Sequence, residues 1–265
     1  KKMIVMLKKL LVDLIYVFPK LNLFKTVYVN FKLLPFSQAR RFPIFIYHNV
    51  RLLGLSGKVI LNCEPKRGML QFGHSLEYVK VENGKGQFTI NGTLVINGYD
   101  NVMSKSVKLI ITKDGTLEIG SNSYWGTNVK VIVTNKVYLG NFFRMPFESQ
   151  LLDTNFHFVI DVSTRKVESL AAKSIYIGDY VWIANRSSIM GGTVLPSKCM
   201  ITSNSLINKN FSELDDYAII GGIPAKFIKY GKIRVYNAET EHFLLNYFKT
   251  HNERSIILPE EFSII

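Results

Sequence analysis

His157 is the residue of this sequence best suited to acid–base chemistry. It ends the segment LLDTNFH, at a position where a six-residue recurrence of aliphatic residues would place one more aliphatic. The recurrence stops directly after it. An imidazole without partners is costly to bury, whereas an imidazole at a rim beside a projecting loop can exchange a proton near neutral pH. The alternative is a histidine that only hydrogen-bonds a loop carbonyl.

Two further side chains stand out near the same recurrence. Asp153 lies four residues before His157, and on a strand that spacing places both side chains on one face. We expect Asp153 to orient the imidazole or to bind a substrate hydroxyl, the alternative being an ordinary turn aspartate. Trp182 directly precedes Ile183, an inward member of the recurrence. It is therefore predicted to point outward, onto a ligand or into a subunit interface.

Other chemistries find little support in the residues. The sequence holds neither a G-x-x-x-x-G-K-[ST] phosphate loop nor a G-x-S-x-G nucleophile elbow. No His, Cys and carboxylate residues recur at metal-ligand spacing, so no catalytic metal is expected. Two cysteines, Cys63 and Cys199, are too few for a disulfide framework and fit a reducing compartment.

The element that must position these residues is a repeat with a period of six. The inward series is Ile177, Ile183, Ile189, Leu195, Ile201 and Ile207, with Leu139, Met145 and Leu151 before His157 on the same step. Ile119, Trp125 and Val131 precede these after a slip, and Ile90, Ile96 and Val102 form a fainter series. Neither a helix nor a two-residue alternation gives this period. Short strands that form the sides of a triangular coil do, and stacked coils bury one continuous apolar column.

The repeat and its flanking segments resemble the hexapeptide-repeat acyltransferases over about residues 90–233. The resemblance is carried by SIYIGDYVWIANRSSIMGGTVLPSKCMITSNSLINKN, by the turn YAIIGGIPAKFIK, and by LLDTNFH followed by IGDYVWI. The last pair is similar to bacterial sugar and polysaccharide O-acetyltransferases of this family. The resemblance implies an all-β solenoid, a left-handed parallel β-helix of hexapeptide repeats with a basic N-terminal lead-in and a C-terminal helix.

The resemblance also implies the chemistry. The donor would be acetyl-coenzyme A, His157 the general base, and the protein a homotrimer with its sites between subunits. The residues carried over to the coenzyme groove are Trp182, Asn185, Ser203, Asn208, Lys209 and Lys226. The sequence departs from the family where Thr202–Ser205 replaces Gly-Ala-Gly-Ser. Asn204 there replaces a glycine, which puts the local backbone in question.

Three regions are expected along the chain. Residues 1–60 form a basic lead-in and residues 61–233 the β-helix acyltransferase domain, with residues 158–173 as a projecting loop. Residues 234–265 form a C-terminal helix and tail. Asn237 is expected to cap that helix, and Phe243, Leu244, Tyr247 and Phe248 to form its apolar face.

Charge points to an anionic partner. Of the 265 residues 47% are hydrophobic, which suits a packed core, and the net charge is +13. Residues 1–60 hold eleven Lys or Arg against one acid, Asp13. We expect contact with the inner face of a membrane, a lipid-linked or acidic saccharide as acceptor, a cytoplasmic location and no nucleic acid. Lys8, Lys9 and Asp13 interrupt the apolar start, so no membrane span is expected.

Three hypotheses follow. The leading one is an acetyltransferase that moves acetyl from acetyl-coenzyme A to a sugar hydroxyl in bacterial surface polysaccharide biosynthesis. The second keeps the fold and acetylates the amine of a nucleotide-linked amino sugar. The third is a non-catalytic trimeric scaffold that binds glycans, for which the altered Thr202–Ser205 stretch is the support.

Overall fold

The computed structural model describes residues 20–74, 84–167 and 171–265. Lys1, Lys2, Lys8, Lys9 and Asp13 of the lead-in lie outside these residues. Within them, short strands form three sheets. Sheet A contains β1 (Ile44–Ile46), β4 (Leu70–Phe72), β7 (Asn101–Met103), β10 (Tyr124–Trp125), β13 (Arg144–Met145), β16 (Trp182–Ile183), β19 (Met200–Ile201), β21 (Ile219–Gly222) and β22 (Ala225–Lys229).

Sheets B and C complete the coils. Sheet B contains β2 (Val50–Leu52), β5 (Gly86–Ile90), β8 (Lys108–Ile111), β11 (Lys130–Val133), β14 (Gln150–Leu152), β17 (Ser188–Met190) and β20 (Leu206–Ile207). Sheet C contains β3 (Lys58–Leu61), β6 (Thr93–Ile96), β9 (Thr116–Ile119), β12 (Lys136–Leu139), β15 (Ile175–Ile177) and β18 (Val194–Leu195). The chain visits A, B and C in turn and then returns to A one level higher.

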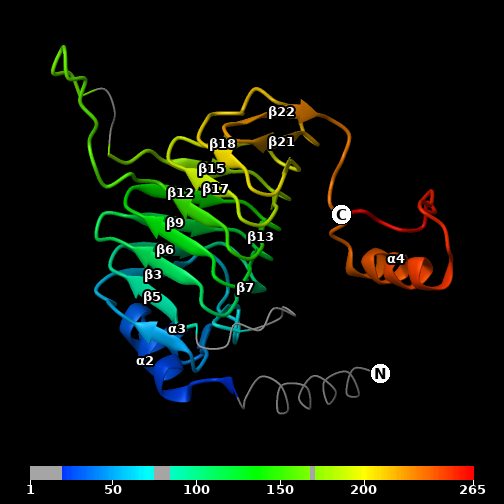
Figure 1. Cartoon of the computed structure of the whole chain (residues 1–265). Coiled ribbons are helices and arrows are strands. Elements are labelled where there is room, and N and C mark those ends of the chain that lie inside the picture. The colour runs from blue at the N-terminus through cyan, green and yellow to red at the C-terminus, as the bar shows by residue number, and fades with distance from the viewer. Residues whose placement is uncertain (1–19, 75–83, 168–170) are drawn as a thin grey trace, which may run out of the picture.

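Each strand except β22 pairs in parallel with the strand one coil away, which makes a solenoid (Figure 1). Trp125 of β10 pairs with Met145 of β13, and Ile183 of β16 pairs with Ile201 of β19. One coil therefore takes 20 residues between β10 and β13 and 18 residues between β16 and β19. The expected left-handed parallel β-helix with a C-terminal helix is confirmed.

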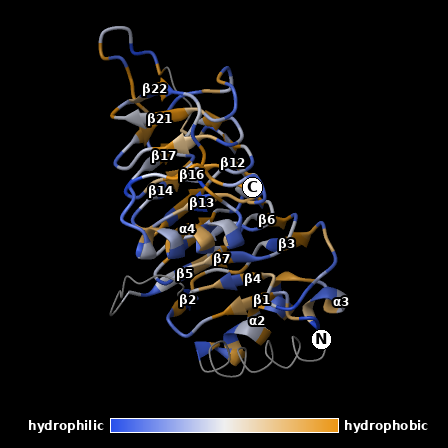
Figure 2. Ribbon diagram, turned by 90° about the vertical axis from the view of Figure 1, so that its right-hand side faces the viewer, coloured by the Kyte–Doolittle hydropathy of each residue, from blue (hydrophilic) through white to orange (hydrophobic). Residues whose placement is uncertain are grey.

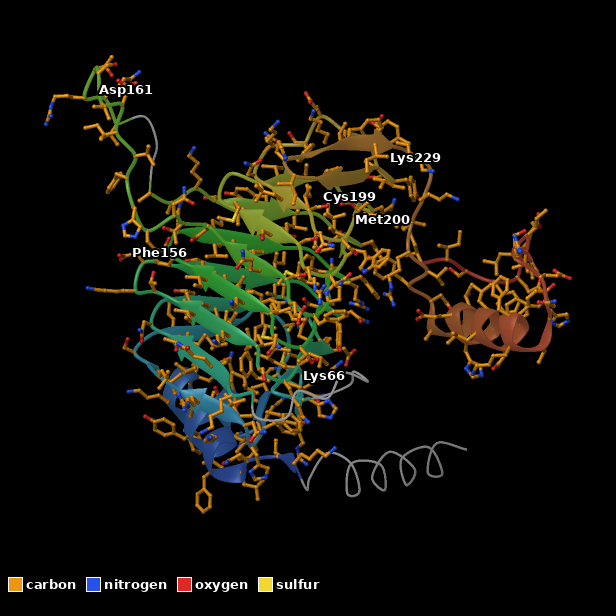
Figure 3. The ribbon with its side chains drawn as sticks, viewed as in Figure 1. Lys66, Phe156, Asp161, Cys199, Met200 and Lys229 are labelled. Atoms are coloured by element: carbon orange, nitrogen blue, oxygen red, sulfur yellow. The ribbon has the colours of Figure 1, made fainter. Side chains whose placement is uncertain are left out.

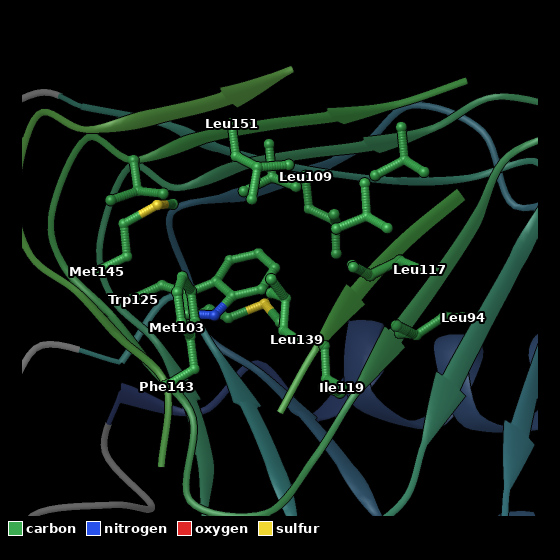
Figure 4. Close-up of a cluster of buried hydrophobic side chains, with 14 of the residues drawn as sticks. Leu94, Met103, Leu109, Leu117, Ile119, Trp125, Leu139, Phe143, Met145 and Leu151 are labelled. Atoms are coloured by element: carbon green, nitrogen blue, oxygen red, sulfur yellow. The ribbon is translucent and has the colours of Figure 1, made fainter. Parts of the chain in front are cut away.

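The core is the column of side chains predicted from the period. All six members of the series from Ile177 to Ile207 are at most 2% exposed. Trp125, Leu139, Met145 and Leu151 are fully buried in the same interior (Figure 4). The fainter series is wrong at its last member, because Met103 is buried while Val102 lies on the outer side of β7.

The solenoid begins earlier than expected. β1, β2 and β3 pair with β4, β5 and β6, so residues 44–60 belong to the first coil and not to a separate lead-in. The six-residue period did not reveal this coil. Ile44 pairs with Leu70 and Leu70 pairs with Asn101, and these partners lie further apart in the sequence than three six-residue repeats would place them.

The corners between sheets A and B repeat one backbone conformation. Asn128, Glu148, Arg186 and Asn204 occupy successive levels with φ of 62°, 60°, 59° and 56°. Asn204 therefore adopts the left-handed conformation that a glycine would take, and the backbone of this corner has the same conformation as the other corners. Glycine is required elsewhere by close approach, because a Cβ on Gly140 would lie 2.6 Å from the carbonyl carbon of Gly178.

The two ends of the solenoid are closed differently. Helix α2 (Leu23–Leu33) lies against β1 at the first end, followed by the short α3 (Phe36–Ala39), while β22 pairs antiparallel with β21 at the other (Figures 1 and 2). Helix α4 (Ala238–Thr250) follows, and Asn237 caps it by accepting from the N–H groups of Glu239 and Thr240. Among the described residues, no helix has the length and apolarity to cross a membrane.

Candidate functional site

A projecting segment interrupts the solenoid after β14. We call residues 154–172 the arm, of which residues 168–170 are outside the described part. Thr154 pairs with Ala172 at its base and Ile160 with Val167 further out, both antiparallel. Asp161 at its tip accepts from the Ser163 and Thr164 hydroxyls at 2.6 and 2.8 Å. Figures 1 and 3 show the arm extending away from the strands, with Phe156 and Asp161 labelled on it.

Asp153 ends the coil from which the arm departs. Its side chain is fully buried. One carboxylate oxygen accepts from the backbone N–H and hydroxyl of Thr134 at 2.8 and 2.9 Å, and the other accepts from the N–H of Asn135 at 2.7 Å. These bonds fix the neighbouring turn. The expectation that Asp153 orients His157 is thus not supported, since its carboxylate is committed to Thr134 and Asn135.

His157 is exposed on the arm, close to its base. The expectation that it would take a corner position of the repeat is wrong, because the chain leaves the coil at Asp153, before the next corner is reached. The placement at a rim beside a projecting loop does hold. Asn155, two residues earlier, is held by its N–H, which donates to the carbonyl of Ala171 at 3.0 Å.

A polar cleft of about 360 Å³ opens at the base of the arm. Its lining combines the ends of β14, β17 and β20 with both roots of the arm: Asp153, Asn155, Ala171, Lys173, Met190, Gly191, Leu206 and Asn208. Of the residues singled out in the sequence, it brings together Asp153 and Asn208, and Asn155 lies in the same lining. The wall also contains Lys173, which sequence reasoning did not single out, although it is the last residue of the expected loop.

The remaining predicted donor residues lie on other parts of the surface. Trp182 is half-buried on the outer side of sheet A, as expected from its inward neighbour Ile183. Asn185 and Ser203 face each other at a corner between sheets A and B, where the Ser203 hydroxyl donates to the Asn185 side-chain oxygen at 2.7 Å. Lys209 and Lys226 are exposed. Within one chain these residues do not join the cleft.

An aromatic and cationic cluster joins the C-terminal segment to sheet A. The ring of Tyr236 lies 5.2 Å from Tyr180, which stacks on Phe142 at 4.6 Å. The Arg144 guanidinium lies 5.6 Å from the Tyr236 ring and donates to the Asn122 side chain at 2.9 Å. Burial, followed by the nearby charge of Arg234, lowers the pKa of Arg144 to about 10, so Arg144 stays charged at neutral pH. In the sequence, this cluster is marked by Arg144, a charged residue that directly precedes the inward Met145.

Comparison of this chain with known proteins found similar proteins among the solved structures. No known family model matches the chain, and no curated protein matches its sequence. The polySia-specific acetyltransferase NeuO is 19% identical over 82% of this chain and 91% of its own, with a TM-score of 0.43. The polysialic acid O-acetyltransferase OatWY is 16% identical over 76% of this chain and 100% of its own, with a TM-score of 0.44.

A third similar structure is a hexapeptide-repeat acetyltransferase of Vibrio cholerae, solved with acetyl-coenzyme A. It is 15% identical over 78% of this chain and 83% of its own, with a TM-score of 0.30. The pairing of the strands defines the fold of this chain. The chain is a parallel β-helix of six-residue repeats, and the solved structures similar to it include polysialic acid and hexapeptide-repeat acetyltransferases.

Proposed function

We propose that this protein transfers acetyl from acetyl-coenzyme A to a hydroxyl of a saccharide, with His157 as general base. The observation that carries the proposal is the position of His157, exposed at the root of the arm and two residues from Asn155 in the wall of the polar cleft. The resemblance of LLDTNFH followed by IGDYVWI to sugar O-acetyltransferases supports the same reaction. We further propose that this step belongs to bacterial surface polysaccharide assembly.

The proposed step needs one proton transfer and one acyl transfer. The imidazole of His157 accepts the proton of the acceptor hydroxyl as that oxygen attacks the thioester carbonyl. The carbon–sulfur bond then breaks, and the coenzyme thiolate leaves with a proton returned from the imidazolium. A general base of this kind contributes a factor of roughly 10²–10⁴ to the rate. Side-chain amides in the cleft, Asn155 and Asn208, are suited to hold saccharide hydroxyls.

The donor residues fit a coenzyme site built between two copies of the chain. Asn185 and Ser203 form an exposed hydrogen-bonded pair at a corner where Asn204 adopts the left-handed backbone conformation of the other corners. Lys209 and Lys226 add exposed cations suited to phosphates. Since Asn185, Ser203 and Lys226 are not part of the lining of the cleft at the root of the arm, we propose that the arm of one subunit meets the corner of its neighbour in a homotrimer.

Calorimetric titration of acetyl-coenzyme A into the wild type and His157→Ala tests the donor site, and thiol release with saccharide acceptors tests transfer. We expect His157→Ala to bind acetyl-coenzyme A like the wild type and to lose about 10²-fold or more in transfer rate. His242→Ala, an exposed histidine on α4, is the matched control and should keep full activity.

The acceptor panel pairs each hydroxyl sugar with its amino analogue. Transfer to the amine alone would replace the proposal with N-acetylation. If neither protein binds acetyl-coenzyme A while both keep the same oligomeric mass, the proposed reaction is wrong and a glycan-binding scaffold takes its place.

A further inference from the structure

Helix α2 exposes an apolar face at the first end of the solenoid. Phe24 is 91% exposed, Leu23 60% and Tyr28 55%, and Val27 and Phe31 are exposed beside them. These five residues line one shallow groove together with Lys32. Fully solvated aromatic and aliphatic side chains in one contiguous patch mark an interaction surface.

The orientation of this face is fixed by the opposite side of the helix. Asn30 donates to the carbonyl of Ile44 at 2.7 Å and accepts from its N–H at 3.1 Å. Thr26 accepts from the N–H of Ile46 at 3.0 Å. Because these bonds and the buried Val29 and Leu33 hold α2 on β1, the groove-lining residues must point away from the solenoid.

The apolar surface extends beyond α2. Phe36 of α3 is 72% exposed, and its ring lies 5.8 Å from that of Phe31. We call the patch formed by Leu23, Phe24, Val27, Tyr28, Phe31 and Phe36 the basal face. Figure 2 shows α2 below β1 and β2, at the end of the stack of coils.

The charged residues in the segment that forms the basal face have one sign. Residues 20–60 contain Lys20, Lys25, Lys32, Arg40, Arg41, Arg51 and Lys58, and no Asp or Glu. Arg41 pairs with Glu64, and Lys25 donates to the carbonyl of Val50 at 2.5 Å. Two exposed cations belong to the same segment: Lys32 is in the last turn of α2, and Arg40 directly follows α3.

We propose that the basal face docks on an anionic lipid surface, with Phe24, Phe31 and Phe36 in the interface and the lysines and arginines at the headgroups. An interfacial helix combines such a face with basic residues, and anionic headgroups attract each nearby cation. At 11 residues, α2 is about 16 Å long and lies on a membrane without crossing it. A second copy would bring the same cations with no carboxylate of residues 20–60 to meet them, so it is disfavoured.

Flotation of the full-length protein with vesicles tests the proposal without any use of acetyl transfer. We expect binding to phosphatidylcholine vesicles that contain about a third phosphatidylglycerol, little binding to phosphatidylcholine alone, and loss of binding with added salt. Phe24→Ser with Phe31→Ser should weaken binding about tenfold or more. The matched control is Phe158→Ser, since Phe158 is 67% exposed on the arm.

Charge is tested separately by Lys32→Glu with Arg40→Glu, against Lys249→Glu on α4 as control. We expect about tenfold weaker binding for the α2 and α3 pair, since each reversal removes one attraction and adds one repulsion. Near-wild-type circular dichroism in all variants shows that folding is intact. Unchanged flotation of the phenylalanine pair, equal binding to neutral vesicles, or no binding by the wild type overturns the proposal. The proposal is also overturned if the double variant Phe24→Ser, Phe31→Ser has half the oligomeric mass of the wild type, because the basal face would then be an interface with a second copy of the chain.

Discussion

At the scale of single residues, the structure separates two side chains that the sequence placed together. Asp153 and His157 share LLDTNFH, and a strand through both would have put them on one face. The chain turns out of the coil between them. Asp153 stays buried on Thr134 and Asn135, and His157 reaches solvent. The break in the period predicted the rim position of the histidine, whereas the hydrogen bonds of the aspartate depend on a turn one coil away that no local pattern reveals.

Asp153→Asn is expected to lower the free energy of unfolding by about 1–3 kcal/mol, because an amide N–H₂ would face a backbone donor that has lost its acceptor. Denaturant unfolding measures the change. Asp114→Asn, at an exposed aspartate in the turn between β8 and β9, is the control and should unfold like the wild type. Per folded molecule, Asp153→Asn should retain far more transfer activity than His157→Ala. Equal losses in the two variants would restore a direct role for Asp153.

Cys199 gives a prediction for alkaline pH. Burial raises the pKa of its thiol from 9.0 to about 12. In the unfolded chain the thiol ionises above about 9, while the folded chain keeps it protonated, so this group favours unfolding increasingly between pH 9 and 12. Stability measured at rising pH should fall less steeply in Cys199→Ala than in the wild type. Identical slopes would contradict the effect of burial.

At the scale of elements, the six-residue period was most informative where the coils are regular. It identified the buried column from Leu139 to Leu151 and from Ile177 to Ile207. It misplaced Val102 and His157, and it missed the first coil, because the long stretches of sequence between β1, β4 and β7 hide the period. The donor residues were named by resemblance. Their spread over a corner and an outer sheet face emerges only from the three-dimensional stack.

The C-terminal helix α4 gives the prediction at this scale. Tyr236 packs on Phe142 and Tyr180 and lies over Arg144, just before the cap Asn237. We expect Tyr236→Ala to detach residues 232–265 from sheet A while the solenoid stays folded, since coils depend mainly on their neighbours. Limited proteolysis with mass spectrometry should find faster cleavage near residue 232. Tyr247→Ala on α4 is the control, and equal cleavage in both variants would remove Tyr236 as the anchor.

At the scale of the whole molecule, the separation of His157 from the donor corner predicts shared sites. In a trimer, each site would take His157 from one subunit and Ser203 from the next. Co-expression of His157→Ala with Ser203→Trp, each inactive alone, should therefore restore about a quarter of wild-type activity, the fraction of randomly assembled sites with both residues intact. Sedimentation should give three times the 30.3 kDa chain mass. No recovery in verified mixed oligomers would place the complete site within one subunit.

The parallel stacking of coils also fixes the distance between the cleft and the basal end of the solenoid. In sheet B the cleft is reached at β14 to β20, four to six strands from β2 at the basal end. With about 4.8 Å per strand, the cleft stands roughly 20–30 Å above the first coil. If the basal face rests on lipid, the number of coils sets the height at which an acceptor anchored in the same surface is acetylated. Adding one whole coil between the ends would raise the reaction by one strand spacing and leave its chemistry unchanged.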